Sequence, residues 1–182
     1  MRAAILALPL LATLMMTACK SEDAAPAASA AKPTPAPTVV VDEHSYAEPN
    51  KVAITDLALE LALDFDTKTL SGTATYALDW KDKAATALLL DTRDLTIEKV
   101  EGGDGKGAWA PLTFKLAAAD NVLGSKFSID TPKRDAQVRV TYRTVPTASG
   151  LQWLEPSMTE GKQLPFMFSQ SQQIHARSWV PL

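Results

Sequence analysis

The pattern of hydrophobic and polar residues has a period of two over much of the chain. Leucine occupies every second position of Leu57–Leu63, with alanine or glutamate between. Side chains of a β-strand point alternately to its two faces, so this pattern predicts a strand with one buried face. The alternation resumes over Leu70–Trp80 after the polar stretch Asp64–Lys68, which predicts a β-hairpin. Gly72 lies inside the second segment and indicates a bulge or a close approach of another backbone.

Further short apolar stretches follow the predicted hairpin. They are Ala87–Asp91, Leu95–Val100, Pro111–Leu116, Lys126–Ile129 and Ala136–Tyr142. Turn-forming residues separate them, and Glu101–Gly107 alone holds four of the chain's eight glycines. No segment after the amino-terminal stretch keeps the 3.6-residue period of a helix. The pattern therefore predicts an all-β domain, built as an antiparallel sandwich or a large curved sheet.

The first 18 residues have the features of a secretory signal peptide. Arg2 precedes the largely apolar stretch Ala3–Leu14, whose twelve residues are too few to span a bilayer. The only cysteine, Cys19, follows Met-Thr-Ala, and this sequence resembles the lipobox at which bacterial lipoproteins are cleaved and acylated. Two or more acyl chains suffice for stable anchoring. We predict a membrane-anchored protein lipidated at Cys19, with its domain facing the periplasm or the exterior. The alternative is an ordinary signal peptide beside an incidental cysteine.

An alanine- and proline-rich stretch separates this cysteine from the predicted strands. Seven of the 19 residues of Lys20–Thr38 are alanine and four are proline. Proline prevents a regular helix, and little in this composition can be buried, so the stretch is expected to be a disordered, semi-rigid tether. The predicted organisation is a signal peptide over residues 1–18, the lipidated cysteine and linker over 19–44, and the β domain over 45–182, which is expected to be incomplete at its carboxyl end.

Composition and charge narrow the possible functions. The chain has 182 residues, of which 46% are hydrophobic, so it can form one domain with a sizeable core. Its 18 basic and 21 acidic residues give a net charge of −3, which lacks the basic excess typical of nucleic-acid binding. A single cysteine excludes an intrachain disulfide and a metal site built from several cysteines.

Three local patterns partly resemble phosphate-binding or cation-binding sites. Glu101–Gly107 resembles a phosphate loop, but Val100 and Gly107 stand where that motif needs its first glycine and its serine or threonine, so a hairpin loop is favoured. The pairs Asp64/Asp66 and Asp91/Asp94 lack the further oxygen ligands of a calcium site. The first pair is interpreted as a charged turn, and the second is expected to flank a turn in the same way.

The sequence around the two histidines contains no recognisable active-site motif. His44 and His175 are far apart in the chain and belong to no His-Glu-x-x-His motif. The Gly-x-Ser-x-Gly motif of serine hydrolases is also missing. We therefore predict no catalytic residue and no metal ligand in this chain.

Glutamines are concentrated near the carboxyl end. Gln170, Gln172 and Gln173 fall within four positions of a segment that reads Phe-Ser-Gln-Ser-Gln-Gln-Ile-His. Amides both donate and accept hydrogen bonds, so glutamines at alternate positions of a strand are suited to line a polar pocket. From the residues alone, a polar strand edge or a buried amide network is favoured over such a pocket.

Four segments together resemble a known family. They are Ser45–Pro49, Leu70–Ala74, Ala148–Trp153 and Phe168–Arg177. These segments are similar to the amino-terminal domain of zinc aminopeptidases, and most of all to the leukotriene A4 hydrolase-like branch. The resemblance extends over Ser45–Leu182, and its most specific part is the glutamine-containing block.

The resemblance implies a saddle-like antiparallel β domain that precedes a catalytic domain with a zinc site. The zinc ligands would lie beyond Leu182, so this chain is expected to be a fragment that binds no zinc and is inactive alone. The implied partners are that catalytic domain and a peptide with a free amino terminus, whose end Gln170, Ser171 and Gln172 would bind. Ser171 stands where relatives often have cysteine, and Gln173 where a small residue is common. The competing interpretation is a lipid-anchored β-sandwich that acts as a binding or surface-assembly module.

Overall fold

The structure, a computed structural model, describes residues 42–182. The predicted signal peptide, Cys19 and most of the predicted linker lie outside the described residues. The strands in the described part are β1 (Val52–Asp64), β2 (Thr69–Trp80), β3 (Ala87–Thr92), β4 (Thr96–Gly103), β5 (Trp109–Pro111), β6 (Phe114–Leu116), β7 (Ser125–Asp130), β8 (Gln137–Arg143), β9 (Leu151–Leu154) and β10 (Phe166–Ser169). The helical segments among these residues are two short 3-10 turns, η1 (Pro156–Met158) and η2 (His175–Ser178). The predicted all-β fold is confirmed.

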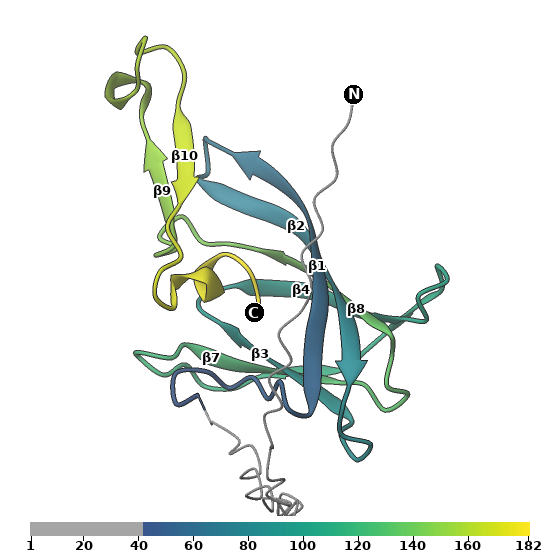
Figure 1. The fold of residues 1–182 in the computed structure, drawn as a ribbon. Helices are drawn as coiled ribbons and strands as arrows, with labels where there is room; N and C mark the ends of the chain where they lie inside the picture. The colour runs from purple at the N-terminus through teal and green to yellow at the C-terminus, as the bar shows by residue number, and fades with distance from the viewer. Residues whose placement is uncertain (1–41) are drawn as a thin grey trace, which may run out of the picture. The chain divides into compact units, whose positions relative to one another are not determined.

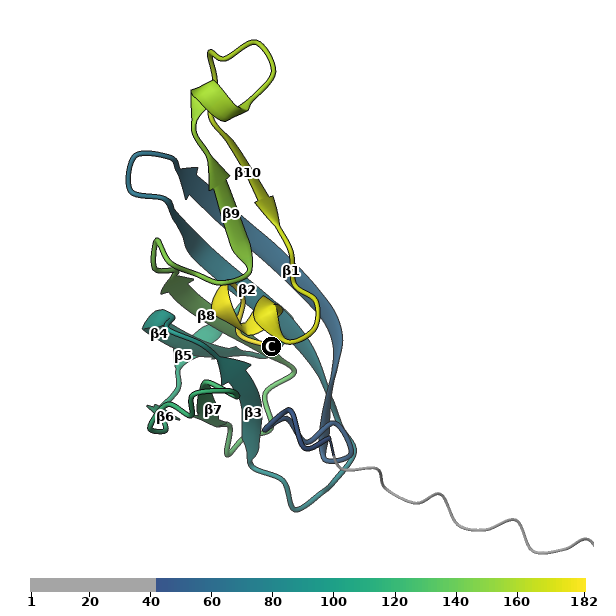
Figure 2. The same cartoon turned by 90° about the vertical axis from the view of Figure 1, so that its left-hand side faces the viewer.

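The strands form three antiparallel sheets. The largest has the strand order β1-β2-β8-β4-β5, the second has the order β3-β7-β6, and β9 and β10 form a separate hairpin. In Figure 1 the five-stranded and three-stranded sheets lie across from one another, and the tip of the β9–β10 hairpin extends beyond both. Figure 2 shows this hairpin beside the far end of β1 and β2. None of the described helices is long and apolar enough to cross a membrane.

The β1–β2 hairpin forms where the alternation predicts it. Its register runs without interruption from Asp56↔Ala77 to Asp64↔Thr69. The backbone of Gly72 has φ +152°, and a Cβ placed there would lie 2.0 Å from the carbonyl oxygen of Glu60. The predicted close backbone approach is therefore confirmed. Asp64 accepts hydrogen bonds from turn amides, which agrees with its interpretation as a charged turn.

The predicted buried face of β1 is only partly buried. Leu57 and Leu61 pack against the core, whereas Leu59 and Leu63 are exposed. The strand lies at the edge of its sheet with β2 as its one neighbour there. An edge strand that extends past the opposite sheet has fewer neighbours to cover it, and alternation alone does not reveal this.

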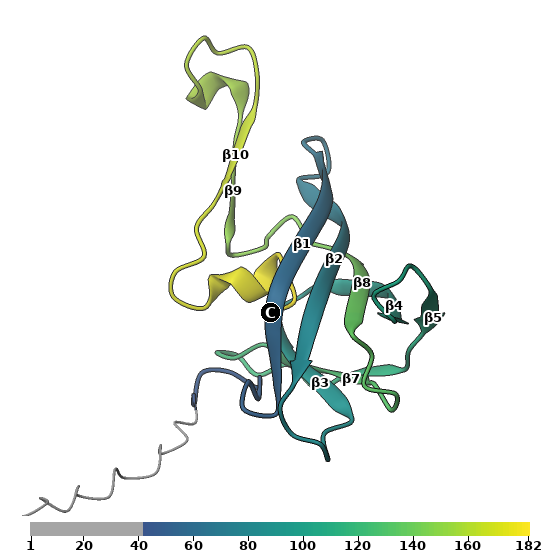
Figure 3. The same ribbon diagram turned by 45° about the vertical axis from the view of Figure 1, so that its right-hand side comes forward.

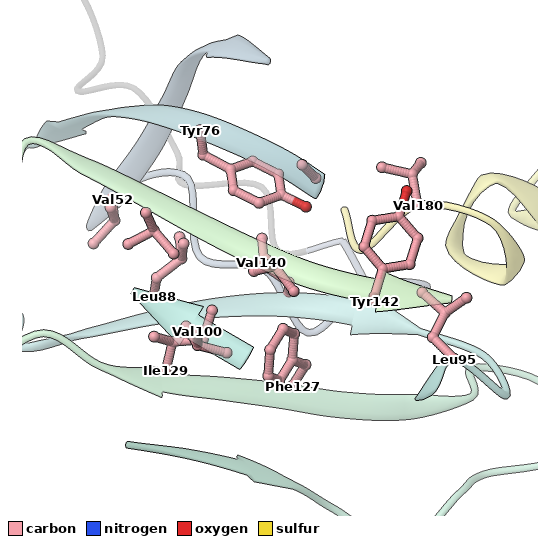
Figure 4. Packing of buried hydrophobic residues seen from close by; sticks show 13 residues of the cluster. Val52, Tyr76, Leu88, Leu95, Val100, Phe127, Ile129, Val140, Tyr142 and Val180 are labelled. Atoms are coloured by element: carbon pink, nitrogen blue, oxygen red, sulfur yellow. The ribbon is translucent and has the colours of Figure 1, made fainter. Parts of the chain in front are cut away.

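Side chains from the two larger sheets meet in one hydrophobic core, shown in Figure 4. The five-stranded sheet contributes Tyr76, Val100, Val138, Val140 and Tyr142, and the three-stranded sheet contributes Leu88, Leu90, Phe127 and Ile129. All of these side chains are nearly inaccessible to water. Burying a large apolar side chain contributes roughly 1.5–3 kcal/mol, so this cluster is the main source of the domain's stability.

One predicted strand divides between the two sheets. Pro111–Leu116 was expected to be a single strand, but β5 ends at Pro111 and β6 begins at Phe114. The Leu112 amide donates to the Val100 carbonyl of β4 at 2.9 Å, whereas the next carbonyl, that of Thr113, accepts from Asp130 of β7 at 2.9 Å. The chain thus changes sheets between these two residues. The glycine-rich segment is also shorter as a loop than expected, because β4 continues through Gly103.

Candidate functional site

The glutamine segment first continues the β9–β10 hairpin by one residue and then forms a turn. We call Gln170–His175 the glutamine turn. The Gln170 amide donates to the Gly150 carbonyl at 2.8 Å, which extends the β9–β10 pairing by one residue. The chain then turns, because the His175 amide donates to the Ser171 carbonyl at 2.9 Å. The expectation that Gln170 and Gln172 share one extended strand is therefore wrong. The side chain of Gln170 instead reaches forward, and its Oε1 accepts from the Gln172 amide at 3.4 Å.

The side chains of this turn differ in exposure. Gln170, Gln172 and Gln173 are exposed, whereas Ser171 is half-buried. The indole N–H of Trp179 donates to Ser171 Oγ at 3.0 Å. Ser171 is thus held against the body of the domain while the glutamine amides face outward. Exposed amides offer both donors and acceptors to a ligand.

A second set of hydrogen bonds fixes the turn against β9. The Gly150 amide donates to Ser178 Oγ at 2.8 Å, and that hydroxyl donates to the His175 carbonyl at 2.7 Å. A Cβ at Gly150 would lie 2.7 Å from the same carbonyl oxygen, so this contact requires glycine. The His175 ring is also engaged, because its Nδ1 lies 2.8 Å from Ser149 Oγ.

A buried ion pair anchors η2 to the three-stranded sheet. Arg177 Nη2 lies 3.3 Å from Asp91 Oδ2, and both side chains are 6% exposed. Asp91 belongs to β3 and precedes the bend at residues 93–94, so it flanks a turn as expected, but its side chain is buried in this ion pair. A buried charge is costly unless it is paired and hydrogen-bonded, and both partners here meet that condition.

The same ion pair holds the start of the described chain. Asp91 accepts hydrogen bonds from the Ser45 hydroxyl at 2.6 Å and the Tyr46 amide at 2.8 Å. Arg177 donates to the carbonyls of His44 at 2.7 Å and Leu123 at 2.6 Å. Sequence reasoning missed this arrangement, because nothing in the spacing of these residues indicates that they meet.

Two buried tyrosines of the five-stranded sheet bind the carboxyl-terminal backbone. Tyr76 donates to the Pro181 carbonyl at 2.5 Å, and Tyr142 donates to the Trp179 carbonyl at 2.9 Å. Burial raises the pKa of Tyr76 and of Tyr142 well above the usual tyrosine value. Figures 1 and 2 show the resulting position of η2, between the β9–β10 hairpin and the three-stranded sheet. The segment that follows the glutamine turn is therefore fixed against the body of the domain.

The histidines and carboxylates singled out from the sequence form no metal site in the described part. Within residues 42–182, no group of three His, Cys, Asp or Glu side chains is placed to hold a metal ion. A cavity of about 280 Å³ lies beside η2, lined among others by Gln173, Ile174 and Arg177, but not by Gln170 or Gln172. The two candidate glutamines are therefore exposed and do not line this cavity.

Fold and site together define an antiparallel β domain that presents outward-facing amides at the end of a hairpin. Residues 44–182 match the Peptidase M1 N-terminal domain family. The chain belongs to this family, and the predicted resemblance to aminopeptidase amino-terminal domains is confirmed.

Individual relatives agree with this assignment. The chain is 33% identical to leukotriene A-4 hydrolase of Xenopus laevis, over 78% of this chain and 23% of that protein. It is 35% identical to leucine aminopeptidase 2 of Yarrowia lipolytica, over 70% of this chain and 19% of that protein. The structure of native yeast LTA4 hydrolase matches with a TM-score of 0.71 and 27% identity, over 81% of this chain and 23% of the other. The chain thus spans at most about a quarter of the length of these relatives.

Proposed function

We propose that this chain is the substrate-end-binding domain of a zinc aminopeptidase that hydrolyses amino-terminal peptide bonds. The observation that carries the proposal is the turn at the end of β10, where Gln170 and Gln172 face outward and Ser171 is fixed from behind by Trp179. Membership of the family and the leucine aminopeptidases among the relatives support the peptide as substrate.

The glutamines act by positioning the substrate. The amino end of a peptide carries a positive charge and three N–H donors, and an amide carbonyl accepts from it without placing a second charge in the site. A substrate held by its end presents the first peptide bond at a fixed distance from the reacting groups, which lowers the entropic part of the barrier. Because Ser171 is tied to the body of the domain, the backbone that carries the glutamines on either side of it is fixed before the substrate arrives.

The described residues do not fit a zinc ion. The His175 ring is bonded to Ser149, and His44 lies beside Asp42 with no third ligand. We assign the zinc ligands and the glutamate base to a catalytic domain in a longer protein of which this chain is the amino-terminal part. Bound zinc supplies Lewis-acid activation of water in such enzymes. The residues of this chain bind and orient the substrate.

The test is to compare the 182-residue chain with the longer protein in turnover of aminoacyl chromogenic substrates. We expect turnover by the longer protein alone and inhibition by bestatin, with which a yeast LTA4 hydrolase of similar fold has been solved. A longer protein with no aminopeptidase activity would leave the non-enzymatic, lipid-anchored module as the better interpretation. Zinc-dependent turnover by the 182-residue chain would contradict the assignment of roles.

A further inference from the structure

The glutamine turn has little side-chain packing to hold it in place. Its glutamines are exposed, and its other residues, Ser171, Ile174 and His175, are only half-buried. On one side the turn borders the cavity of about 280 Å³, which Gln173 and Ile174 line. A segment beside a cavity has no packed neighbours on that side to immobilise it. The position of the turn therefore depends on polar contacts made by the residues that flank it.

Arg177, two residues after the turn, makes the largest set of these contacts. Its Nη2 lies 3.3 Å from Asp91 Oδ2, and both side chains are 6% exposed. Arg177 Nη1 donates to the Leu123 carbonyl at 2.6 Å, and Nη2 donates to the His44 carbonyl at 2.7 Å. One guanidinium thus joins η2 to β3, to the loop before β7 and to the start of the described chain.

The connection from Arg177 back to the glutamine turn is short and hydrogen-bonded. The His175 amide donates to the Ser171 carbonyl at 2.9 Å and so closes the turn. The His175 carbonyl accepts from the hydroxyl of Ser178, the residue after Arg177, at 2.7 Å. Hydrogen bonds on both sides of Arg177 therefore tie it to the residue that closes the turn. A displacement of Arg177 would move that residue as well.

We propose that Asp91 and Arg177 are positioning residues that hold the glutamine turn where it meets the amino end of a substrate. The inference rests on the proposed function and deepens it. Neither side chain contacts the substrate, because both are buried in their ion pair. They act through the backbone between Arg177 and Ser171. A misplacement of about 1 Å in a substrate-positioning group can cost about a hundredfold in rate, so residues behind such a group affect turnover.

Arg177→Lys tests the proposal without removing the charge that faces Asp91. A single ammonium group lacks the planar fork with which arginine bonds to a carboxylate and two carbonyls at once. Hydrogen exchange at the His175 amide of the 182-residue chain, followed by NMR, reports the opening of the turn and needs no activity. We expect exchange at this amide to be about tenfold faster in Arg177→Lys than in the unchanged chain.

Two further variants make the exchange measurement specific. Arg139→Lys is the matched control, because Arg139 also bonds to a nearly buried carboxylate, that of Glu101 at 2.9 Å, but on the outer face of the five-stranded sheet. It should leave exchange at His175 unchanged. Ser45→Ala is the milder variant, because it removes the 2.6 Å hydrogen bond to Asp91 and leaves both charges paired. It should speed exchange at His175 by about threefold.

A double-mutant cycle in the longer protein separates positioning from general stabilisation. Arg177→Lys should lower kcat/KM by about tenfold, and Arg139→Lys should leave it unchanged. In a background that carries both Gln170→Leu and Gln172→Leu, Arg177→Lys should lower kcat/KM by less than about twofold, because the contacts that it positions are already lost. A residue that only stabilises the domain would cause the same loss in both backgrounds.

Two results would overturn the proposal. Unchanged exchange at His175 in Arg177→Lys would show that the turn is held without the ion pair, and Ser45→Ala decides the same point if Arg177→Lys does not fold. An equal loss of kcat/KM in both backgrounds would show that the pair acts on the whole domain and not through the turn. Kinetics that do not respond to loss of both glutamines would instead reject the proposed function, while the exchange rates would still decide whether the pair holds the turn.

Discussion

The contact between the glutamine turn and β9 depends on the absence of a side chain at Gly150. A Cβ at this position would meet the His175 carbonyl at 2.7 Å, Trp179 Cδ1 at 2.8 Å and Ser178 Oγ at 3.0 Å. Two of these atoms belong to the network that closes the turn. A single methyl group would therefore separate the glutamine turn from the hairpin that supports it.

We expect Gly150→Ala to lower the free energy of unfolding by about 2–3 kcal/mol, which is the usual cost of forcing extra volume into a packed site. Urea unfolding of the 182-residue chain measures this change in the free energy of unfolding. Gly161→Ala is the control, because a Cβ there meets nothing within 4 Å and only its positive φ of +77° is unfavourable, at about 1 kcal/mol. A Gly150→Ala variant as stable as Gly161→Ala would show that the contact carries no weight.

Single residues also show what sequence reasoning could and could not reach. The exposed amides of Gln170 and Gln172 were found because three glutamines in four positions are unusual and resemble a family motif. Arg177 and Asp91 were missed, because the two residues are distant in the chain and each has an ordinary local context. A long-range ion pair leaves no periodic signal, and only the fold brings its partners together.

At the scale of elements, the alternation of apolar residues predicted strands well where the whole segment pairs within one sheet. The β1–β2 hairpin and its polar turn follow directly from Leu57–Leu63 and Leu70–Trp80. The prediction was wrong over Pro111–Leu116, because a chain that changes sheets keeps its alternation while its hydrogen-bond partners change. It was also wrong at Gln172, because the backbone bond that closes the turn at Ser171 has no signature in the side chains.

Two tyrosine hydrogen bonds join the carboxyl-terminal segment to the five-stranded sheet, and they make the stability of the domain depend on pH in a defined direction. Tyr76 and Tyr142 are protonated donors in the folded chain, and burial raises the pKa of both. In the unfolded chain a tyrosine releases its proton at about pH 10. Above that pH the unfolded state binds fewer protons than the folded state, so stability falls as the pH rises.

We therefore expect these two tyrosines to leave the free energy of unfolding unchanged below about pH 9. Above about pH 10 they should make it decline. Chemical denaturation of the 182-residue chain across this range measures the slope. Tyr142→Phe should cost about 1 kcal/mol at neutral pH through its lost hydrogen bond, and it should reduce the alkaline slope. An unchanged slope in that variant would contradict the role given to Tyr142.

At the scale of the whole molecule, the described residues form a support whose carboxyl end is fixed from two sides. Figure 3 shows η2 and the end of the chain below the β9–β10 hairpin. Tyrosines hold this segment from the five-stranded sheet, and the Asp91–Arg177 ion pair holds it from the three-stranded sheet. The family assignment came from four short motifs. Where these motifs lie relative to one another in space could not be derived from them, because it depends on how the sheets pack.

The predicted membrane attachment concerns the part of the chain before residue 42. We expect the 182-residue chain expressed in a bacterium to enter the detergent phase on partitioning, because acylation at Cys19 adds about 0.8 kcal/mol of membrane affinity for each buried methylene. Cys19→Ser should stay in the aqueous phase. Equal partitioning of both proteins into detergent would contradict a lipoprotein.

The central claim is that the glutamine turn binds the amino end of a peptide, and Gln172→Leu in the longer protein tests it most directly. Loss of a hydrogen bond to a charged group costs about 1.5–3 kcal/mol, so kcat/KM should fall by roughly 10- to 150-fold. Zinc content and Tm should stay the same, because Gln172 is exposed and far from any packing role. Gln173→Leu, at the adjacent exposed glutamine, is the control and should keep its kinetics. Unchanged kcat/KM in Gln172→Leu, or a loss of activity accompanied by a collapse in Tm, would contradict a substrate-binding role for the turn.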